Sequence, residues 1–279
     1  MTITPALLSG GIGQRLREAF NDLSPQEQRA AEFMREHLAD LAVYNASEVA
    51  RLSGVSKATI SRLYRRLGFE NAEEVRDHVR ALRSAGTPIA GDTPASVTAQ
   101  LEREVANLRD ALSALDTAAI APVIAGARRV VVLGFRNSYP VALHLRQQLA
   151  QVRDNVALAP LPGQSIGEEI AALHPDDVVL LVGFRRRPEF FSRLVGQLAA
   201  SDAPLILIAD EGGRRYAAQA DHFISCPLDS VTAFDSYAAA ASVVSLLAAA
   251  VLGEALRAGR ARINDIGAAY TGLDELESF

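Results

Sequence analysis

The sequence predicts two domains of different class: an all-α domain over residues 1–84 and an α/β domain over residues 96–279. Helix-start motifs and helical apolar spacing fill the first part, whereas short apolar runs alternate with helical segments from residue 128 onward. Between them, residues 84–94 are dense in Gly, Pro and Thr without periodicity, which predicts a linker over residues 85–95. A chain of 279 residues is long enough for two hydrophobic cores.

The composition limits the class of protein. With 49% hydrophobic and 22% charged residues, the chain is of the globular type. Its net charge of -5 excludes a protein that is basic throughout but permits a local basic patch. The segment from Ala46 to Arg83 is such a patch, because it carries 8 Lys and Arg against 5 Asp and Glu.

The single cysteine, Cys226, excludes an internal disulfide and any zinc site built from several cysteines, and we expect neither metal nor cofactor. The N-terminus lacks the basic flank and long apolar core of a signal peptide. The apolar stretch 238–252 is too short for a membrane span, and its Ala and Ser content favours close helix packing. We therefore expect a cytoplasmic protein.

Helix-start motifs and helical spacing predict the helices of the first domain, taken here in chain order. Residues 12–20 have the spacing of a short amphipathic helix. Ser24 and Glu27 form a capping box with Pro25 in the first turn, which predicts a helix to about Leu38. Asn71 and Glu74 repeat the box and predict a further helix to about Ser84.

The stretch Asn45–Phe69 predicts two short helices around a tight turn, a helix-turn-helix. Asn45 and Glu48 stand at capping-box spacing before the first helix, and Gly54 supplies the left-handed residue that a sharp exit needs. Ser56 caps the second helix. The apolar residues that we expect to face inward are Val49, Ala50, Leu52, Ile60, Leu63 and Leu67.

The outward residues of this helix-turn-helix are short, hydroxylated or cationic, and we expect them to bind double-stranded DNA. Short side chains in the first turns of the second helix would reach base edges in the major groove, and Arg65 and Arg66 would reach phosphates. The alternative is a helical hairpin with an ordinary solvated basic face. The predicted DNA-binding residues are Ser47, Ser56, Lys57, Ala58, Thr59, Ser61, Arg62, Arg65 and Arg66.

Short apolar runs in the second part predict strands, and the segments between them predict helices. Such alternation predicts a parallel sheet with helices on both faces, a flavodoxin- or Rossmann-like arrangement. The expected strands are 130–133, 156–158, 178–182, 205–208 and 222–225, and the expected helices are 96–115, 141–152, 190–200 and 235–256. The last helix is apolar around its circumference, so we expect part of it to pack against a second copy of the chain.

The stretch Ala50–Phe69 resembles the helix-turn-helix of the RpiR/MurR family of bacterial transcription regulators. The stretches Val130–Ser138 and Asp177–Pro188 resemble the sugar isomerase (SIS) domain that follows it in that family. One recognition helix reads only a few base pairs, so we expect a homodimer or homotetramer that binds a palindromic DNA operator. The resemblance implies that the SIS domain binds a carbohydrate derivative, a phosphosugar or related anionic metabolite, and so modulates operator binding.

The resemblance implies a ligand site on the loops after the first and third strands. Ser138 falls on the family's first-loop serine, and Ser236 on a serine that opens the last helix. The family's second-loop pattern Ser-x-Ser-Gly-x-Thr is replaced by Gly183-Phe-Arg-Arg-Arg-Pro188, which favours a phosphate or carboxylate anion. Alternatively, Arg186 and Arg187 are solvated or pair with Glu189 and Asp210. The predicted ligand-binding residues are Phe135, Arg136, Asn137, Ser138, Gly183, Arg185, Arg186, Arg187 and Ser236.

Two alternatives to a regulator remain at this point. The first is a phosphosugar isomerase with an accessory helical domain, which needs a general base. No two of the candidate bases form a recognisable pair, so we expect no catalytic residues and no enzyme activity; these candidates are His144, His174, His222, Glu168, Glu169 and Glu254. The second is a sugar-binding adaptor without DNA activity, which leaves the basic helix unexplained.

Overall fold

The computed structural model describes residues 11–38, 40–42, 44–84, 96–232 and 234–275. Contacts divide the chain into two units, which we call the helical unit and the α/β unit. The helical unit comprises Met1–Arg103 with Ser230–Asp235, and the α/β unit comprises Glu104–Asp229 with Ser236–Phe279. The linker predicted over residues 85–95 lies outside the described residues.

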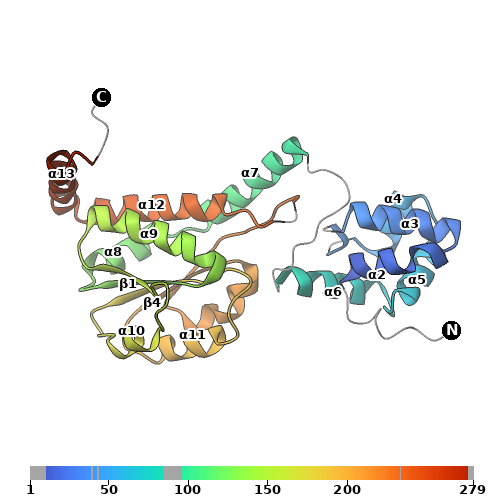
Figure 1. Cartoon of the computed structure of the whole chain (residues 1–279), viewed down its shortest axis with the longest axis horizontal. Coiled ribbons are helices and arrows are strands. Elements are labelled where there is room, and N and C mark those ends of the chain that lie inside the picture. The colour runs from blue at the N-terminus through green and yellow to red at the C-terminus, as the bar shows by residue number, and fades with distance from the viewer. Residues whose placement is uncertain (1–10, 39, 43, 85–95, 233, 276–279) are drawn as a thin grey trace. The chain divides into compact units, whose positions relative to one another are not determined.

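The helices of the helical unit, labelled in Figure 1, pack around one apolar core. Ile60, Leu63 and Leu67 are fully buried in it, as the helical spacing predicts. Its helices are α2 (Ile12–Ala19), α3 (Pro25–Glu36), α4 (Ala46–Ser53), α5 (Lys57–Arg66) and α6 (Ala72–Ser84), with 3-10 turns at Phe20–Asp22 and Asp40–Ala42.

Local capping sets the starts of these helices. At α3 the Glu27 carboxylate accepts hydrogen bonds from the Ser24 backbone N–H (2.9 Å) and from the Ser24 hydroxyl (2.7 Å). At α6 the Asn71 side-chain Oδ1 accepts from the Glu74 N–H at 3.0 Å. The Glu74 carboxylate accepts from the Glu70 N–H rather than from that of Asn71, so the predicted second capping box is only half correct.

The α/β unit contains a five-stranded, wholly parallel sheet of order β2-β1-β3-β4-β5, as the alternation predicts. Val130 of β1 pairs with Val156 of β2 on one side and with Val178 of β3 on the other. The strands are β1 (Val130–Gly134), β2 (Val156–Ala159), β3 (Val178–Val182), β4 (Leu205–Ala209) and β5 (His222–Ser225).

Helices cover both faces of this sheet (Figure 1), and each face has its own hydrophobic core. Val130 and Val132 face one core, and Val131 and Leu133 face the other, because side chains alternate along a strand. On the first face lie α8 (Thr117–Gly126), α9 (Tyr139–Val152) and α12 (Ala238–Glu254). On the second lie α10 (Gly167–Ala171), α11 (Phe191–Ala199) and the 3-10 helix Glu211–Gln219.

The sequence prediction missed three helices. It did not include α8, which is apolar without helical periodicity and contains Pro122, or the short α10. It also predicted a single helix over 235–256, whereas α12 ends at Glu254 and a separate helix, α13 (Leu256–Gly272), follows at a bend of 113°. The remaining helix, α7 (Val97–Ser113), agrees with the prediction.

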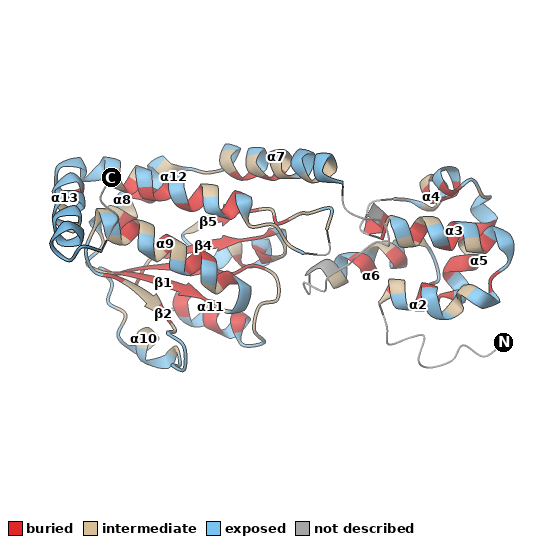
Figure 2. Ribbon diagram, turned by 45° about the horizontal axis from the view of Figure 1, so that its top comes forward, coloured by how far each residue is buried: buried red, intermediate tan, exposed pale blue. Residues whose placement is uncertain are grey.

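In the described part of the chain, no single helix combines the length and apolar character that crossing a membrane requires. The pair α12 and α13 reaches that length and composition only when the two bent helices are taken together. Figure 2 shows that α12 alternates buried and exposed positions, whereas α13 is mostly exposed.

Candidate functional site

The turn between α4 and α5 has the predicted geometry. Gly54 adopts a left-handed conformation with φ of +69°, and the Val55 N–H then donates to the Ala50 carbonyl at 3.0 Å. The Ser56 hydroxyl oxygen accepts a hydrogen bond from the Thr59 N–H at 3.1 Å, which caps the start of α5. The left-handed glycine and these two hydrogen bonds therefore fix the direction in which α5 leaves the turn.

Most of the predicted DNA-binding residues are on the surface of this helix pair. No acidic residue lies in the first turn of α5, and its last turn carries two arginines. Ser61 is partly buried. The exposed residues are Ser47, Ser56, Lys57, Ala58, Arg62, Arg65 and Arg66.

Two exposure predictions for this helix pair are wrong. Thr59 is 4% exposed, and its hydroxyl lies 2.9 Å from that of Ser56. Thr59 is buried because it precedes Leu63 by four residues and so shares the inward face of α5. Leu52, expected inside, is 41% exposed near the end of α4.

Arg66 also departs from the prediction, because its guanidinium contacts the protein's own acceptors. Its Nε lies 3.3 Å from Oε1 of the buried Glu27, and its Nη1 donates to the Asp22 carbonyl at 3.0 Å. Burial raises the pKa of the Glu27 carboxyl, but hydrogen bonds from Ser24 and the charges of Arg66 and Arg62 outweigh it, so this pKa lies below its ordinary value. Arg66 therefore joins α5 to α3 rather than extending freely from the outward face.

In the α/β unit, the loops after β1 and β3 meet at the carboxyl edge of the sheet. Ser138, just before α9, is buried, and its hydroxyl oxygen accepts a hydrogen bond from the Phe184 N–H at 3.0 Å. Parallel neighbouring strands end at the same edge, which brings these two loops together. The predicted convergence of the first and second loops is therefore confirmed, and Ser138 is the residue that joins them.

The three arginines of the second loop have separate environments. The guanidinium of Arg187 forms an ion pair with Asp210, and both side chains are less than a tenth exposed. It also lies over the Phe191 ring, 5.7 Å from its centroid. Burial lowers the pKa of Arg187, and the charge of Asp210 opposes that shift. Arg187 thus pairs internally, as the alternative interpretation expected, and the expectation that it faces an anion is wrong.

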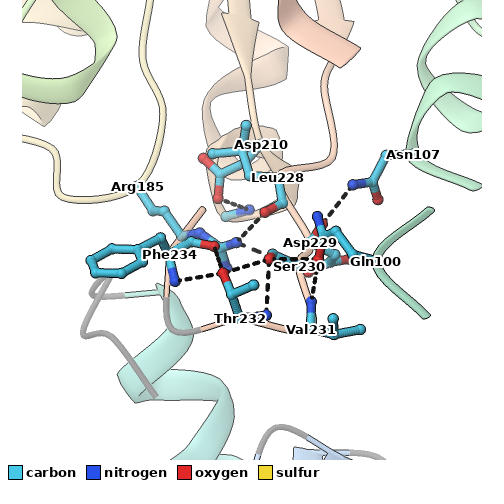
Figure 3. Close-up of polar contacts among 11 residues, drawn as sticks. Gln100, Asn107, Arg185, Asp210, Leu228, Asp229, Ser230, Val231, Thr232 and Phe234 are labelled. Carbon is cyan, nitrogen blue, oxygen red and sulfur yellow. Dashed lines mark hydrogen bonds and ion pairs between the residues drawn. The ribbon is translucent and has the colours of Figure 1, made fainter. Parts of the chain in front are cut away.

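Arg185 is held by the segment that follows β5 (Figure 3). Its side chain is 12% exposed, and its Nη2 donates to the Leu228 carbonyl at 3.0 Å and lies 4.0 Å from Asp229 Oδ1. The Asp229 carbonyl in turn accepts from the Asn107 side chain at 2.6 Å. Arg185 therefore fastens the second loop to this segment.

Arg136 and Arg186 share an unusual backbone conformation. Their φ angles are +54° and +66°, values that are uncommon for residues other than glycine. Arg136 is exposed and Arg186 is partly exposed. Non-glycine residues in this region are often found where a loop has a binding role.

Three other predicted ligand residues make contacts within the protein. A Cβ at Gly183 would lie 2.3 Å from the Phe191 ring, so glycine is required there for close contact rather than for a ligand. The ring of Phe135 meets that of Phe190 edge-to-face at 5.2 Å. The Ser236 hydroxyl oxygen accepts from the Ala238 N–H at 3.3 Å, at the start of α12.

A cavity of about 300 Å³ opens between the first turns of α9 and α12. Asn137 lines it, and the prediction had set aside His144 and had not included Tyr237. The Tyr237 ring also packs edge-to-face against Phe184, 5.6 Å away. The position of Tyr237 next to Ser236 was the available signal in the sequence. The lining residues are Asn137, Pro140, Val141, His144, Tyr237 and Ala241.

Comparison with protein families assigns most of the α/β unit to a known domain family. Residues 123–250 match the family model described as SIS domain. These residues form a SIS domain. A comparison of the sequence with curated proteins found no match.

Solved structures with the same fold include proteins of three bacteria. The sugar isomerase domain of an RpiR transcription factor from Sphaerobacter thermophilus has a TM-score of 0.56 and 21% identity, covering 61% of this chain and 97% of that one. The Vibrio vulnificus NanR protein, complexed with ManNAc-6P, has a TM-score of 0.57 and 16% identity, covering 94% and 99%. A protein of E. coli CFT073 in complex with A5P has a TM-score of 0.51 and 16% identity, covering 61% and 95%.

Two observations on the described residues concern metal and thiol chemistry. Among the described residues, no cluster of three or more His, Cys, Asp or Glu side chains could hold a metal ion. Cys226 is buried, and burial raises the pKa of its thiol to about 12, so it is an unreactive core residue at neutral pH.

Proposed function

We propose that this chain is a DNA-binding transcription regulator of the RpiR/MurR type, whose SIS domain senses an anionic metabolite and so modulates operator binding. The observation that carries the proposal is the surface of α5. An exposed, capped helix start with short polar side chains and arginine, and with no acidic residue in its first turn, suits the major groove of DNA.

In this proposal, α4 and α5 form a helix-turn-helix and the first turns of α5 enter the major groove. Lys57, Ser61 and Arg62 contact base edges, and Arg65 contacts a phosphate. One such helix reads only a few base pairs, so two copies on a palindromic site supply the specificity.

The proposed effector is a phosphosugar or a related phosphate or carboxylate compound bound at the carboxyl edge of the sheet. The supporting residues are Arg136, Asn137 and Arg186, which lie on the two loops that Ser138 joins. A loop that leads into a helix N-terminus favours an anion, because the backbone N–H groups and the helix dipole converge there. The fold similarity to NanR complexed with ManNAc-6P supports this class of ligand.

We also propose that the SIS domain binds its effector without converting it. Two of the carboxylates that could act as a base are engaged elsewhere: Glu168 accepts from Ser165, and Glu169 pairs with Arg129. An isomerase is the second candidate, and the observation that favours it is His144 in the lining of the cavity. Assays of phosphosugar isomerisation with wild type and His144→Ala distinguish an isomerase from a sensor. An isomerase is active as wild type and loses that activity in His144→Ala, whereas a sensor is inactive in both forms.

The test of the regulator begins with selection of bound sequences from a pool of random DNA duplexes, using the full chain. We expect a palindromic sequence that binds at least about 1,000-fold more tightly than random DNA. A thermal-shift screen with phosphosugars and sugar carboxylates then identifies the effector, since a ligand of the folded state raises the melting temperature. Recovery of no preferred sequence would overturn the proposal.

A further inference from the structure

The segment 228–236, which we call the β5–α12 loop, is bonded to itself. Its two ends meet, because the Ser236 N–H donates to the Leu228 carbonyl at 3.2 Å. Within it the hydroxyls of Ser230 and Thr232 lie 2.9 Å apart, and the Ser230 hydroxyl oxygen accepts from the Thr232 N–H at 3.0 Å. These bonds join the described residues of the loop into one body, so a displacement at one end is passed to the other.

Helix α7 holds this loop at two points (Figure 3). Asn107 is 2% exposed, and its side chain donates to the Asp229 carbonyl at 2.6 Å. The Gln100 Oε1 accepts from the Val231 N–H and from the Ser230 hydroxyl, both at 3.0 Å. Gln100 and Asn107 are seven residues apart, about two helical turns, so they lie on the same side of α7. A rotation or shift of α7 therefore changes its bonds to the loop.

Arg185 connects the same loop to the proposed effector site. Its Nη2 donates to the Leu228 carbonyl, which also accepts from Ser236, and lies 4.0 Å from Asp229 Oδ1. Arg185 follows β3 directly before Arg186, one of the proposed effector ligands. The loop after β3, the β5–α12 loop and α7 therefore form a continuous series of contacts.

The chain passes between its two contact units in these same elements. The divisions fall between Arg103 and Glu104 of α7, and at positions 229/230 and 235/236 of the β5–α12 loop. Helix α7 also follows the linker predicted over residues 85–95, which the helix-turn-helix precedes. A change in the position of α7 therefore acts along the chain on the segment that leads to the DNA-binding helices.

We propose that the β5–α12 loop couples the effector site to α7, with Arg185 as the switch between two arrangements. In the first, Arg185 holds the Leu228 carbonyl, and the loop holds α7. An effector anion at the loop after β3 competes for the Arg185 guanidinium, because a hydrogen bond to an anion is stronger than one to a neutral carbonyl. Effector binding thus favours a second arrangement, in which the loop and α7 are released. This inference rests on the proposed function and assigns the regulation of its effector site.

The first test requires neither effector nor DNA. Hydrogen–deuterium exchange is measured peptide by peptide in the full chain, for wild type, Arg185→Ala and the matched control Arg193→Ala, whose arginine is exposed on α11. Arg185→Ala should raise the exchange rates of the β5–α12 loop and of α7 about 10-fold, with β3 and β4 unchanged. Arg193→Ala should keep the wild-type rates in all four elements.

The exchange rate of α7 decides this test. Wild-type rates in α7 of Arg185→Ala overturn the proposal, whether or not the loop exchanges faster, because the contact is then not transmitted. Faster exchange that includes β3 and β4 indicates general unfolding, and Gln100→Ala then decides. It removes only the contacts of α7 with Ser230 and Val231, so it should speed exchange in the loop and in the first half of α7; wild-type rates there overturn the proposal.

Inorganic phosphate is the probe for the switch itself. Added to wild type, it should raise the exchange rates of the β5–α12 loop and α7 toward those of Arg185→Ala, and it should change neither rate in Arg185→Ala. Chloride at the same ionic strength should have no effect on either protein. Wild-type rates that phosphate leaves unchanged, or that chloride raises equally, overturn the role of Arg185 as a switch.

The last test uses the operator recovered by selection, without effector. Arg185→Ala and Gln100→Ala both release α7, so each should shift the operator dissociation constant in the same direction by about 5-fold or more, and Arg193→Ala should not shift it. The double variant should show no more than the larger single effect, because both act through one loop. Additive effects, or wild-type affinity in both single variants, overturn the proposal and leave the proposed function intact. If selection recovers no operator, the proposed function fails, whereas the exchange tests still decide whether the loop is coupled to α7.

Discussion

The arginines of α5 and those of the loop after β3 look alike in the sequence and differ in the structure. In α5, Arg62 and Arg65 are exposed, as helical spacing predicts. In the loop, Arg187 is buried in an ion pair with Asp210 and Arg185 is bonded to the Leu228 carbonyl. Helical periodicity fixes the direction of a side chain, whereas the direction of a loop side chain depends on acceptors that are distant in sequence.

The largest effect should come from the buried pair in the SIS domain. Asp210→Asn leaves the Arg187 guanidinium buried without a counter-charge, and we expect a loss of about 3–5 kcal/mol in the free energy of unfolding. Adding Arg187→Met should restore much of that stability. The measurement is urea unfolding of the two variants. A double variant that is less stable than Asp210→Asn would show that Arg187 has another essential contact.

Glycine at two positions should respond in opposite directions to the same substitution. Gly183→Ala places a methyl group 2.3 Å from the Phe191 ring, and overpacking should cost about 1–3 kcal/mol. Gly196→Ala in α11 meets nothing within 4 Å and should stabilise the helix by about 0.5–1 kcal/mol. Thermal unfolding of both variants checks this. Equal effects would mean that Gly183 is not held against Phe191.

Three arginine substitutions in α5 should separate base reading, phosphate contact and internal packing. On the selected operator, Arg62→Ala should cost about 1–3 kcal/mol of binding free energy, with little effect on random DNA. Arg65→Ala should weaken binding to the operator and to random DNA alike. It should also reduce the slope of the logarithm of the binding constant against the logarithm of the salt concentration by about one. Arg66→Ala should mainly lower the stability of the helical unit, through its contacts with Glu27 and Asp22. Fluorescence anisotropy at several salt concentrations distinguishes them, and equal salt slopes for Arg65→Ala and wild type would remove Arg65 from phosphate contact.

The smallest effect should be the acid sensitivity of the helical unit. The pKa of Glu27 is below its ordinary value of 4.5, so its ionised form stabilises the fold at neutral pH. That stabilisation is complete above the ordinary value and is lost as pH falls through the lowered pKa. Glu27→Gln should therefore be less stable than wild type at pH 7, and the difference should shrink at pH 3. A difference that is constant with pH would exclude the charge of Glu27 as its cause.

The sequence alone predicted those features that neighbouring residues determine. Asn45, Gly54 and Ser56 set the two helices and the turn through contacts within a few residues, and all three behave as expected. The three central strands, β1, β3 and β4, followed from continuous apolar runs, because strands covered on both faces are buried along their whole length. Candidate residues such as Arg62 and Ser138 were also identifiable, since a helix face and a loop after a strand have predictable positions.

Only the tertiary structure decided which polar groups were available and where the last helix ended. Arg187 met Asp210 across 23 residues, and Arg66 reached Asp22 across 44, so neither contact has a local signature. The break between α12 and α13 lies at Ala255, two residues after Gly253, where the backbone leaves helical geometry. After the break, the Arg262 Nε of α13 donates to the Ala150 carbonyl of α9, a contact across 112 residues that has no local signature either.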